Sequence, residues 1–256
     1  MTAGRLAASL ALAVLAATTA ACTSSSGDSP AGEAQTTITV GAASSLTDVF
    51  EQIATDFTEA NPDVIITFSF AASSTLAEQI RGGAPLDVFA SAGRTAMEPL
   101  VAEGLVTGVA DFATNALQIA TPPGNPAGVT GLADLPNVSV LVCEKQVPCG
   151  VAAMELFERN SLAVSPVSFE SDVRSVLTKI EADEADAGIV YVTDVIAAGA
   201  KVVGIAIPSD ANVTSIYQAA VVAESARADA AARFVAFLTG PQAQAALAAA
   251  GFDGAS

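Results

Sequence analysis

From about residue 36 onward, hydrophobic positions follow two alternating spacings. Residues 36–42 and 64–70 are rich in apolar and β-branched side chains, which predicts buried strands. Between these runs, apolar residues recur every three or four positions from Leu46, which predicts a helix that stops before Pro62. Regular alternation of strands and helices predicts an α/β fold with parallel sheets and helices on both faces.

The same alternation continues toward the end of the chain. Further strands are predicted over residues 87–90, 117–121, 138–142, 187–192, 202–207 and 215–222. Further helices are predicted around residues 76–80, 96–103, 154–157, 173–180 (with Ser171 as its N-cap), 228–238 and 242–249. The 256 residues, 52% of them hydrophobic, are enough for one large domain or for two lobes with a sizeable core.

Two serine-bearing segments, residues 41–47 and 68–76, each follow a predicted strand and open a predicted helix. The first N–H groups of a helix have no partner within the helix and lie at the positive end of its dipole, so such a junction can bind a small anion. Ligands of α/β folds bind beyond the carboxyl ends of the strands. Five residues fall at such positions: Ser45, Ser73, Cys149, Val173 and Tyr191.

Each of these positions also has an ordinary structural explanation. On spacing alone, helix capping is the stronger interpretation for both serines, and Ser45 fits a capping box. Ser44, Ser74 and Thr75 are close enough to exchange roles with their neighbours, and Thr75 with Glu78 is an alternative capping pair. By periodicity Val173 is a core residue, and Tyr191 alone is typical of an aromatic residue at a strand end.

The first 35 residues have a different composition. Residues 1–21 are typical of a secretory signal peptide, and residues 22–35 of a flexible tether. The sequence Thr-Ala-Ala-Cys that ends at Cys22 resembles a bacterial lipobox, which predicts lipid attachment to Cys22. Thr19 departs from the Leu, Val or Ile usual there. The alternative is simple cleavage near Ala20, with Cys22 as an incidental thiol.

Charge and composition exclude several classes of function. The formal net charge of −17 argues against nucleic acid and anionic membrane surfaces as partners. Salt screens this charge within about 8 Å, so local donors decide whether an anion binds. The chain has no histidine, and it has no Gly-x-Ser-x-Gly or Ser-x-x-Lys motif at a strand end. These absences argue against a serine hydrolase, the enzyme class considered, and no enzymatic activity is expected.

Several short motifs then occur in the order seen in a known family. They are residues 42–47, 71–80, 83–87, 147–150, 172–174, 188–191 and 240–243. In these motifs the chain resembles bacterial molybdate-binding proteins, the solute-binding components of ABC importers, from about Thr36 to Phe252. The resemblance implies a two-lobed, type II periplasmic binding protein-like fold with a ligand cleft between the lobes. Lobe I would comprise residues 36–114 and 217–256, and lobe II residues 115–216.

The resemblance also implies roles for individual residues. Ser45 and Ser73 would bind molybdate or tungstate through hydroxyl and backbone donors, Cys149 and Val173 through backbone N–H groups, and Tyr191 through its phenol. Molybdenum would be present only within the bound oxyanion, without protein–metal bonds and without another cofactor. The expected partner is an ABC permease, and the expected form is an exported monomer anchored by lipid to the outer face of the cell membrane. The alternative is a receptor of the same fold for sulfate, another small oxyanion or a polar solute.

Cys143 and Cys149 lie in one predicted loop of a chain bound for an oxidising compartment. A disulfide between them is therefore expected, and it would hold the backbone that presents the Cys149 N–H group. Two buried free thiols are the alternative.

Overall fold

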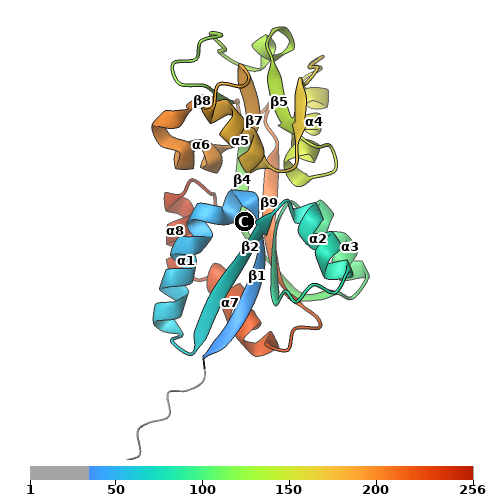
Figure 1. Ribbon diagram of the computed structural model, residues 1–256, viewed down its shortest axis with the longest axis vertical. Helices are drawn as coiled ribbons and strands as arrows, with labels where there is room; N and C mark the ends of the chain where they lie inside the picture. Colours follow the sequence, from blue (N-terminus) through green and yellow to red (C-terminus); the bar gives the residue numbers. More distant parts are fainter. Residues whose placement is uncertain (1–34, 256) are drawn as a thin grey trace, which may run out of the picture. The chain divides into compact units, whose positions relative to one another are not determined.

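The computed structural model describes residues 35–255 (Figure 1). The predicted signal peptide, the predicted tether up to residue 34 and the lipid site at Cys22 lie outside the described residues. Within residues 35–255, none of the helices has the length and apolar character needed to cross a membrane.

The first sheet combines three parallel strands with two antiparallel ones. β1 (Thr36–Ala43) lies between β2 (Val64–Ala71) and β3 (Val88–Ala92), and the three run parallel. β9 (Thr214–Val222) pairs antiparallel with both β3 and β4 (Val106–Thr121), which gives the order β2-β1-β3-β9-β4. The prediction of wholly parallel sheets is therefore wrong for β4 and β9.

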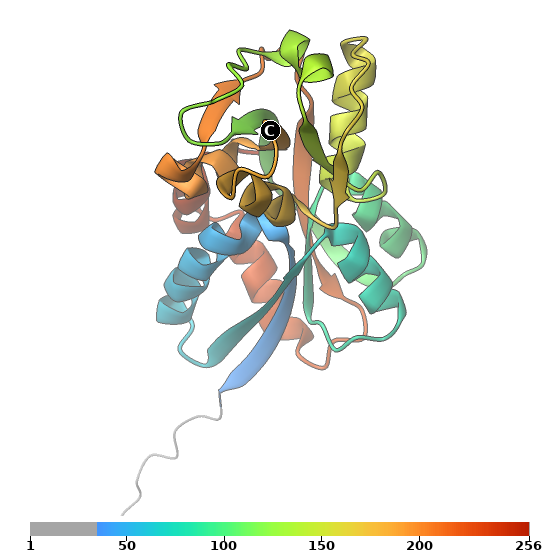
Figure 2. The same ribbon diagram turned by 45° about the horizontal axis from the view of Figure 1, so that its top comes forward.

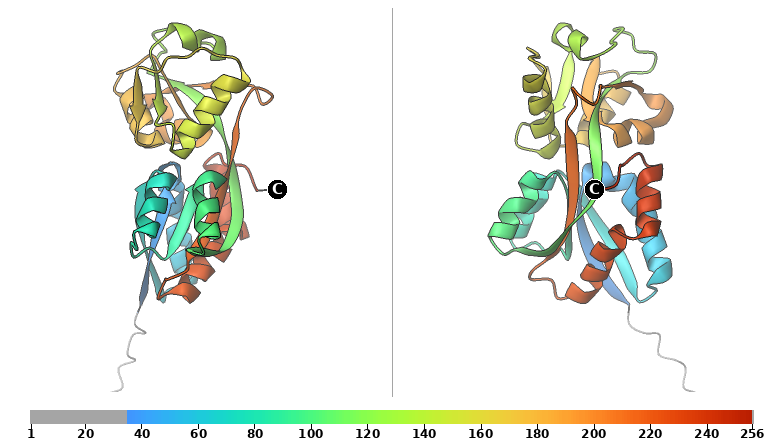
Figure 3. Two further views of the ribbon diagram at one scale, coloured as in Figure 1. Left: turned by 90° about the vertical axis from the view of Figure 1, so that its right-hand side faces the viewer. Right: turned by 180° about the vertical axis from the view of Figure 1, so that it is seen from behind.

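β4 and β9 run in opposite directions because one carries the chain to the second sheet and the other brings it back. From Leu117 on, β4 pairs with β7 (Ala187–Tyr191) and β8 (Val203–Ala206) instead of β9. Figure 3 shows β4 and β9 side by side where the chain crosses from the first sheet to the second. The strand predicted at residues 117–121 is only the end of β4, because exposed residues interrupt the apolar pattern of its first part.

The second sheet continues from β4 in the order β7-β5-β6. β5 (Val140–Cys143) runs parallel to both β7 and β6 (Ser168–Glu170), the latter a short strand that the sequence pattern did not predict. Three helices pack against this sheet: α4 (Pro148–Arg159), α5 (Val173–Glu181) and α6 (Val192–Ala198).

Five helices cover the two faces of the first sheet. They are α1 (Thr47–Ala60), α2 (Ser73–Arg81), α3 (Met97–Ala102), α7 (Ala228–Leu238) and α8 (Pro241–Ala249). Alternate residues of a strand point to opposite faces. Val88 and Ala90 of β3 accordingly join the core under α1, α7 and α8, whereas Phe89 joins the core under α2 and α3. Short 3-10 turns occur at η1 (Ser44–Leu46), η2 (Arg94–Ala96), η3 (Leu132–Asn137) and η4 (Gly199–Lys201).

The buried side chains form separate cores around the two sheets. We call β1–β3 with α1–α3, α7 and α8 the first lobe, and β5–β8 with α4–α6 the second lobe. The core of the second lobe is built from residues between Leu117 and Val213, joined by Ala72 of the first lobe. The lobe boundaries predicted near residues 115 and 217 fall within β4 and β9, and they stay a prediction.

Candidate functional site

Residues at or just after the ends of the parallel strands meet in one small cavity between the lobes. In Figures 1 and 2 the ends of β1 and β2 point toward the second lobe. The cavity measures about 10 Å³, which is about the space needed for one water-sized sphere. Its lining residues are Ala43, Ser44, Ser45, Ala72, Ser73, Ala92, Pro148, Cys149, Asp172, Val173 and Tyr191. The structure thus brings together all five residues singled out in the sequence, and their role as ligands stays a prediction.

Ser45 does not cap the helix that follows it. The turn η1 is inserted between β1 and α1, so that α1 begins at Thr47 and its N-cap, Leu46, makes no side-chain hydrogen bond. The capping box predicted for Ser45 is therefore wrong. Its Oγ instead lies 2.8 Å from the phenol oxygen of Tyr217. Ser45 itself is among the residues that line the cavity.

Ser73 is the first residue of α2, and it makes no capping bond either. Its Oγ accepts a hydrogen bond from the backbone N–H of Ala92 at 3.0 Å. An accepting hydroxyl still has its own proton to donate. The Ser73 N–H belongs to the first turn of the helix, where N–H groups have no partner within the helix. Ser73 can therefore offer two donors to one ligand.

Tyr217 and Asn115 support Ser45 from behind the cavity. Asn115 Nδ2 donates to Thr193 Oγ1 at 2.8 Å and, at a longer 3.5 Å, to the Tyr217 oxygen. Either hydroxyl can be the donor of the Ser45–Tyr217 hydrogen bond. When Tyr217 donates, the Ser45 proton is free for a ligand. From the sequence, Tyr217 and Asn115 stand only at the predicted lobe boundaries, without a role at the site. Tyr217 lies within an apolar strand, where nothing in the pattern distinguishes it from a core residue.

Tyr191 is 1% exposed, and its phenol lies 3.5 Å from Ser215 Oγ. Its backbone N–H is already used, because it donates to Asp194 Oδ2 at 3.0 Å. Burial raises the pKa of the Tyr191 phenol and also that of Tyr217 well above the ordinary value. Both phenols therefore keep their protons at neutral pH and can each donate a hydrogen bond.

The second lobe contributes two helix starts. A disulfide joins Cys143 to Cys149, with the two Cα atoms 5.7 Å apart, and Cys149 lies in the first turn of α4. Gly150 follows it because a Cβ at this position would lie only 1.9 Å from the carbonyl oxygen of Glu144. The disulfide and this close approach hold the Cys149 backbone against its loop.

The other helix start is that of α5 at Val173. Its N-cap is Asp172, whose Oδ1 accepts from the N–H groups of Arg174 and Ser175 at 2.8 and 3.0 Å. The N-cap predicted at Ser171 is therefore wrong, and Ser171 Oγ donates to Asp172 Oδ2 at 3.2 Å instead. Neither bond to Oδ1 uses the Val173 N–H.

The cavity is lined by uncharged donors, without lysine or arginine among its lining residues. Asp172 is the single carboxylate in that lining, and the sequence placed it in the 172–174 motif without a role at the site. Its oxygens are occupied by the capping N–H groups and by two serine hydroxyls. Among the described residues, no group of three or more His, Cys, Asp or Glu side chains is placed to hold a metal ion. This set of donors suits a small anion bound by hydrogen bonds alone, and the space of about 10 Å³ must widen to admit an ion with four oxygens.

A two-lobed α/β body with one donor-lined cavity at its strand ends is typical of solute-binding proteins. The family model described as bacterial extracellular solute-binding protein matches residues 38–253. The chain belongs to this family. The two-lobed fold class predicted from the sequence is thereby confirmed.

Individual relatives of this solute-binding protein are informative as well. It is 40% identical over 233 residues to the molybdate-binding protein ModA of Mycobacterium tuberculosis, which covers 89% of each chain. It resembles the periplasmic molybdate-binding protein of Azotobacter vinelandii with a TM-score of 0.74 and 22% identity, over 86% of this chain and all of the other. It also resembles the sulfate-binding protein SubI of M. tuberculosis, with a TM-score of 0.76 and 22% identity, over 87% of this chain and 88% of the other. At these identities the two solved structures support the fold alone.

Proposed function

We propose that this protein binds molybdate and delivers it to an ABC importer. The observation that carries the proposal is the convergence of uncharged donors from both lobes on one cavity. The similarity to the M. tuberculosis relative named a molybdate-binding protein supports the choice of anion. Ser45, Ser73 and Tyr191 are assigned side-chain donors, and Cys149 and Val173 are assigned backbone donors.

The chemistry of the cavity favours an oxyanion that carries no proton. Such an ion accepts a hydrogen bond from every donor, and bonds to a charged group contribute about 1.5–3 kcal/mol each. Five convergent donors can therefore offset a large cost of dehydration. Hydrogen phosphate brings a proton that needs an acceptor. The oxygens of Asp172, the carboxylate nearest the site, are already used by its N-cap and serine bonds.

Further properties belong to the same proposal. Tungstate, which has the same charge and shape, is expected to bind as well. We infer an exported monomer that is held to the outer face of the cell membrane by a lipid on Cys22, docks on a permease, and carries out no catalysis. Ligand binding would shift the two lobes toward a closed arrangement, because only then do donors from both lobes reach one ion.

Calorimetry of the purified protein against molybdate, tungstate, sulfate and phosphate tests the proposal. Tight binding of molybdate and tungstate, with sulfate and phosphate much weaker, is the expected result. Tight sulfate binding without a response to molybdate would instead favour a sulfate receptor of the same fold.

A further inference from the structure

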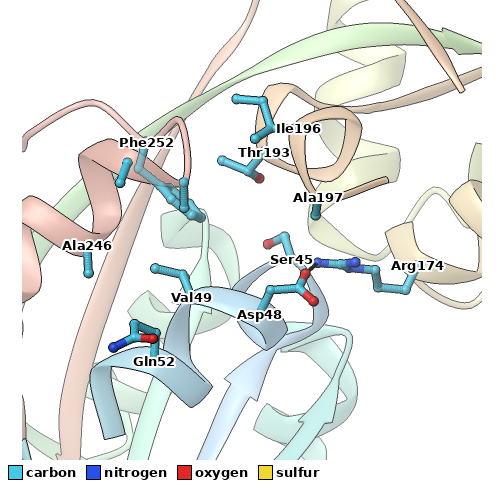
Figure 4. A pocket seen from close by; sticks show the side chains of 12 residues that line it. Ser45, Asp48, Val49, Gln52, Arg174, Thr193, Ile196, Ala197, Ala246 and Phe252 are labelled. Carbon is cyan, nitrogen blue, oxygen red and sulfur yellow. Dashed lines mark hydrogen bonds and ion pairs between the residues drawn. The ribbon is translucent and has the colours of Figure 1, made fainter. Parts of the chain in front are cut away.

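An ion pair joins the two lobes beside the cavity. Arg174, the second residue of α5, pairs through Nη2 with Asp48 Oδ2 in the first turn of α1. Among the ion pairs of residues 35–255, this is the one that connects the first lobe to the second. Figure 4 shows Asp48 and Arg174 pointing toward each other next to Ser45, at the edge of a cavity of about 300 Å³.

Arg174 is positioned from its own lobe by a buried carboxylate. Its Nε lies 3.3 Å from Oδ1 of Asp194, whose side chain is 0% exposed. The other oxygen of Asp194 accepts the N–H of Tyr191, so Asp194 is itself fixed at the start of α6. The Arg174 side chain is 27% exposed, whereas that of Asp48 is 60% exposed. Arg174 is therefore held toward the second lobe by an ion pair with a buried carboxylate, whereas Asp48 is the more exposed member of the pair between the lobes.

The ion pair connects two of the junctions that the proposed oxyanion would connect, the one after β1 and the one at the start of α5. Asp48 is three residues after Ser45, and Arg174 directly follows Val173. Neither charged side chain lines the small cavity itself. Separating the lobes would therefore break the ion pair and the bonds to the ion together. The two interactions act in parallel across the cleft.

We propose that Arg174, positioned by Asp194, pairs with Asp48 as a latch that stabilises the closed arrangement of the lobes and slows release of the bound oxyanion. This inference rests on the proposed function. A ligand that needs the closed arrangement binds less tightly when that arrangement is less populated. Asp48 and Arg174 are thus positioning residues, which act on the ion through the lobes.

The latch and simple charge repulsion predict opposite effects on molybdate affinity when the Asp48 charge is removed. If Asp48 acted only as a negative charge near an anion site, Asp48→Asn would strengthen molybdate binding by removing repulsion. If Asp48 holds the lobes together, the same substitution weakens binding and speeds release. Partly exposed ion pairs contribute little, so the expected change is about two- to fivefold.

The experiment measures the affinity and release rate of molybdate for wild-type protein and three variants. Asp48→Asn is expected to weaken affinity and speed release about two- to fivefold. Asp48→Glu, which keeps the carboxylate, should stay near wild type. Glu51→Gln is the matched control, because it removes one negative charge from an exposed residue of the same helix that forms no ion pair among the described residues.

Two further results decide the matter. In an Arg174→Gln background, Asp48→Asn should have no additional effect, because its partner is already gone. Equal behaviour of Asp48→Asn and Glu51→Gln, or tighter binding by Asp48→Asn, would overturn the latch. If wild-type protein binds no oxyanion, the proposed function fails separately. The latch is then tested by small-angle scattering, where Asp48→Asn but not Glu51→Gln should increase the radius of gyration, and equal radii would overturn it.

Discussion

Replacement of Ser73 by alanine is the sharpest test of the proposed site. The substitution removes the hydroxyl that accepts the Ala92 N–H at 3.0 Å, on a residue that lines the cavity, and with it the proton proposed to bind the ion. The backbone N–H of residue 73 remains, so one of two donors is lost. A hydrogen bond to a charged group contributes about 1.5–3 kcal/mol, which corresponds to an affinity about 10- to 140-fold weaker.

The same substitution has a second effect that must be measured separately. The Ala92 N–H loses its buried acceptor, which is expected to lower the free energy of unfolding by about 1–3 kcal/mol. Chemical denaturation of the ligand-free protein measures this loss, and calorimetry with molybdate measures the affinity. The two measurements distinguish a ligand-binding hydroxyl from a structural one.

Ser74→Ala is the matched control for Ser73→Ala. Ser74 lies in the same first turn of α2 but does not line the cavity. It should leave the molybdate affinity unchanged. A Ser73→Ala protein that is less stable but binds molybdate as tightly as wild type would refute the assignment, because the hydroxyl would then serve only Ala92.

Three other perturbations test the surroundings of the site. Burial raises the pKa of Asp194 to about 6, against the opposing effect of Arg174, whereas an unfolded Asp has a pKa of about 4. The folded state therefore holds the proton more tightly, and this group should cost about 2–3 kcal/mol of unfolding free energy as pH rises from 4 to 7. Asp194→Asn should remove this fall in unfolding free energy between pH 4 and 7, measured by chemical denaturation at each pH. An unchanged pH dependence would contradict a buried carboxylate with a raised pKa. Reduction of the Cys143–Cys149 disulfide, which closes a short loop, should lower the unfolding free energy by about 2 kcal/mol and weaken molybdate binding. Unchanged results in both denaturation and calorimetry would argue that the disulfide does not hold the Cys149 backbone in place for the ligand. Tyr217→Phe keeps the ring but removes the group 2.8 Å from Ser45 Oγ, so affinity should fall about 2- to 12-fold in calorimetry, and no change would exclude a supporting role.

Local patterns were sufficient for the fold class and for the positions of most elements. Strand and helix spacings depend on residues close in sequence, so the runs that became β1, β2 and α1 could be recognised directly. The serine-bearing junctions at Ser45 and Ser73 were found for the same reason. The roles proposed for Cys149, Val173 and Tyr191 came from the family resemblance, although these residues also follow strands. Short elements such as β6 were missed because a strand of three residues is too short to show a hydrophobic periodicity.

The hydrogen-bond partner of each junction serine depends on the tertiary structure. Spacing favoured capping for Ser45 and Ser73, but their hydroxyls bond to Tyr217 and Ala92, which are 172 and 19 residues away. The antiparallel pairing of β4 with β9 and the ion pair between Asp48 and Arg174 likewise join distant segments. The α/β alternation and the donor-bearing junctions could be read from the amino-acid sequence, because these are local properties of the chain. Only the packing of the two lobes decided which donors face one cavity, because hydrogen-bond partners far apart in sequence have no local signature.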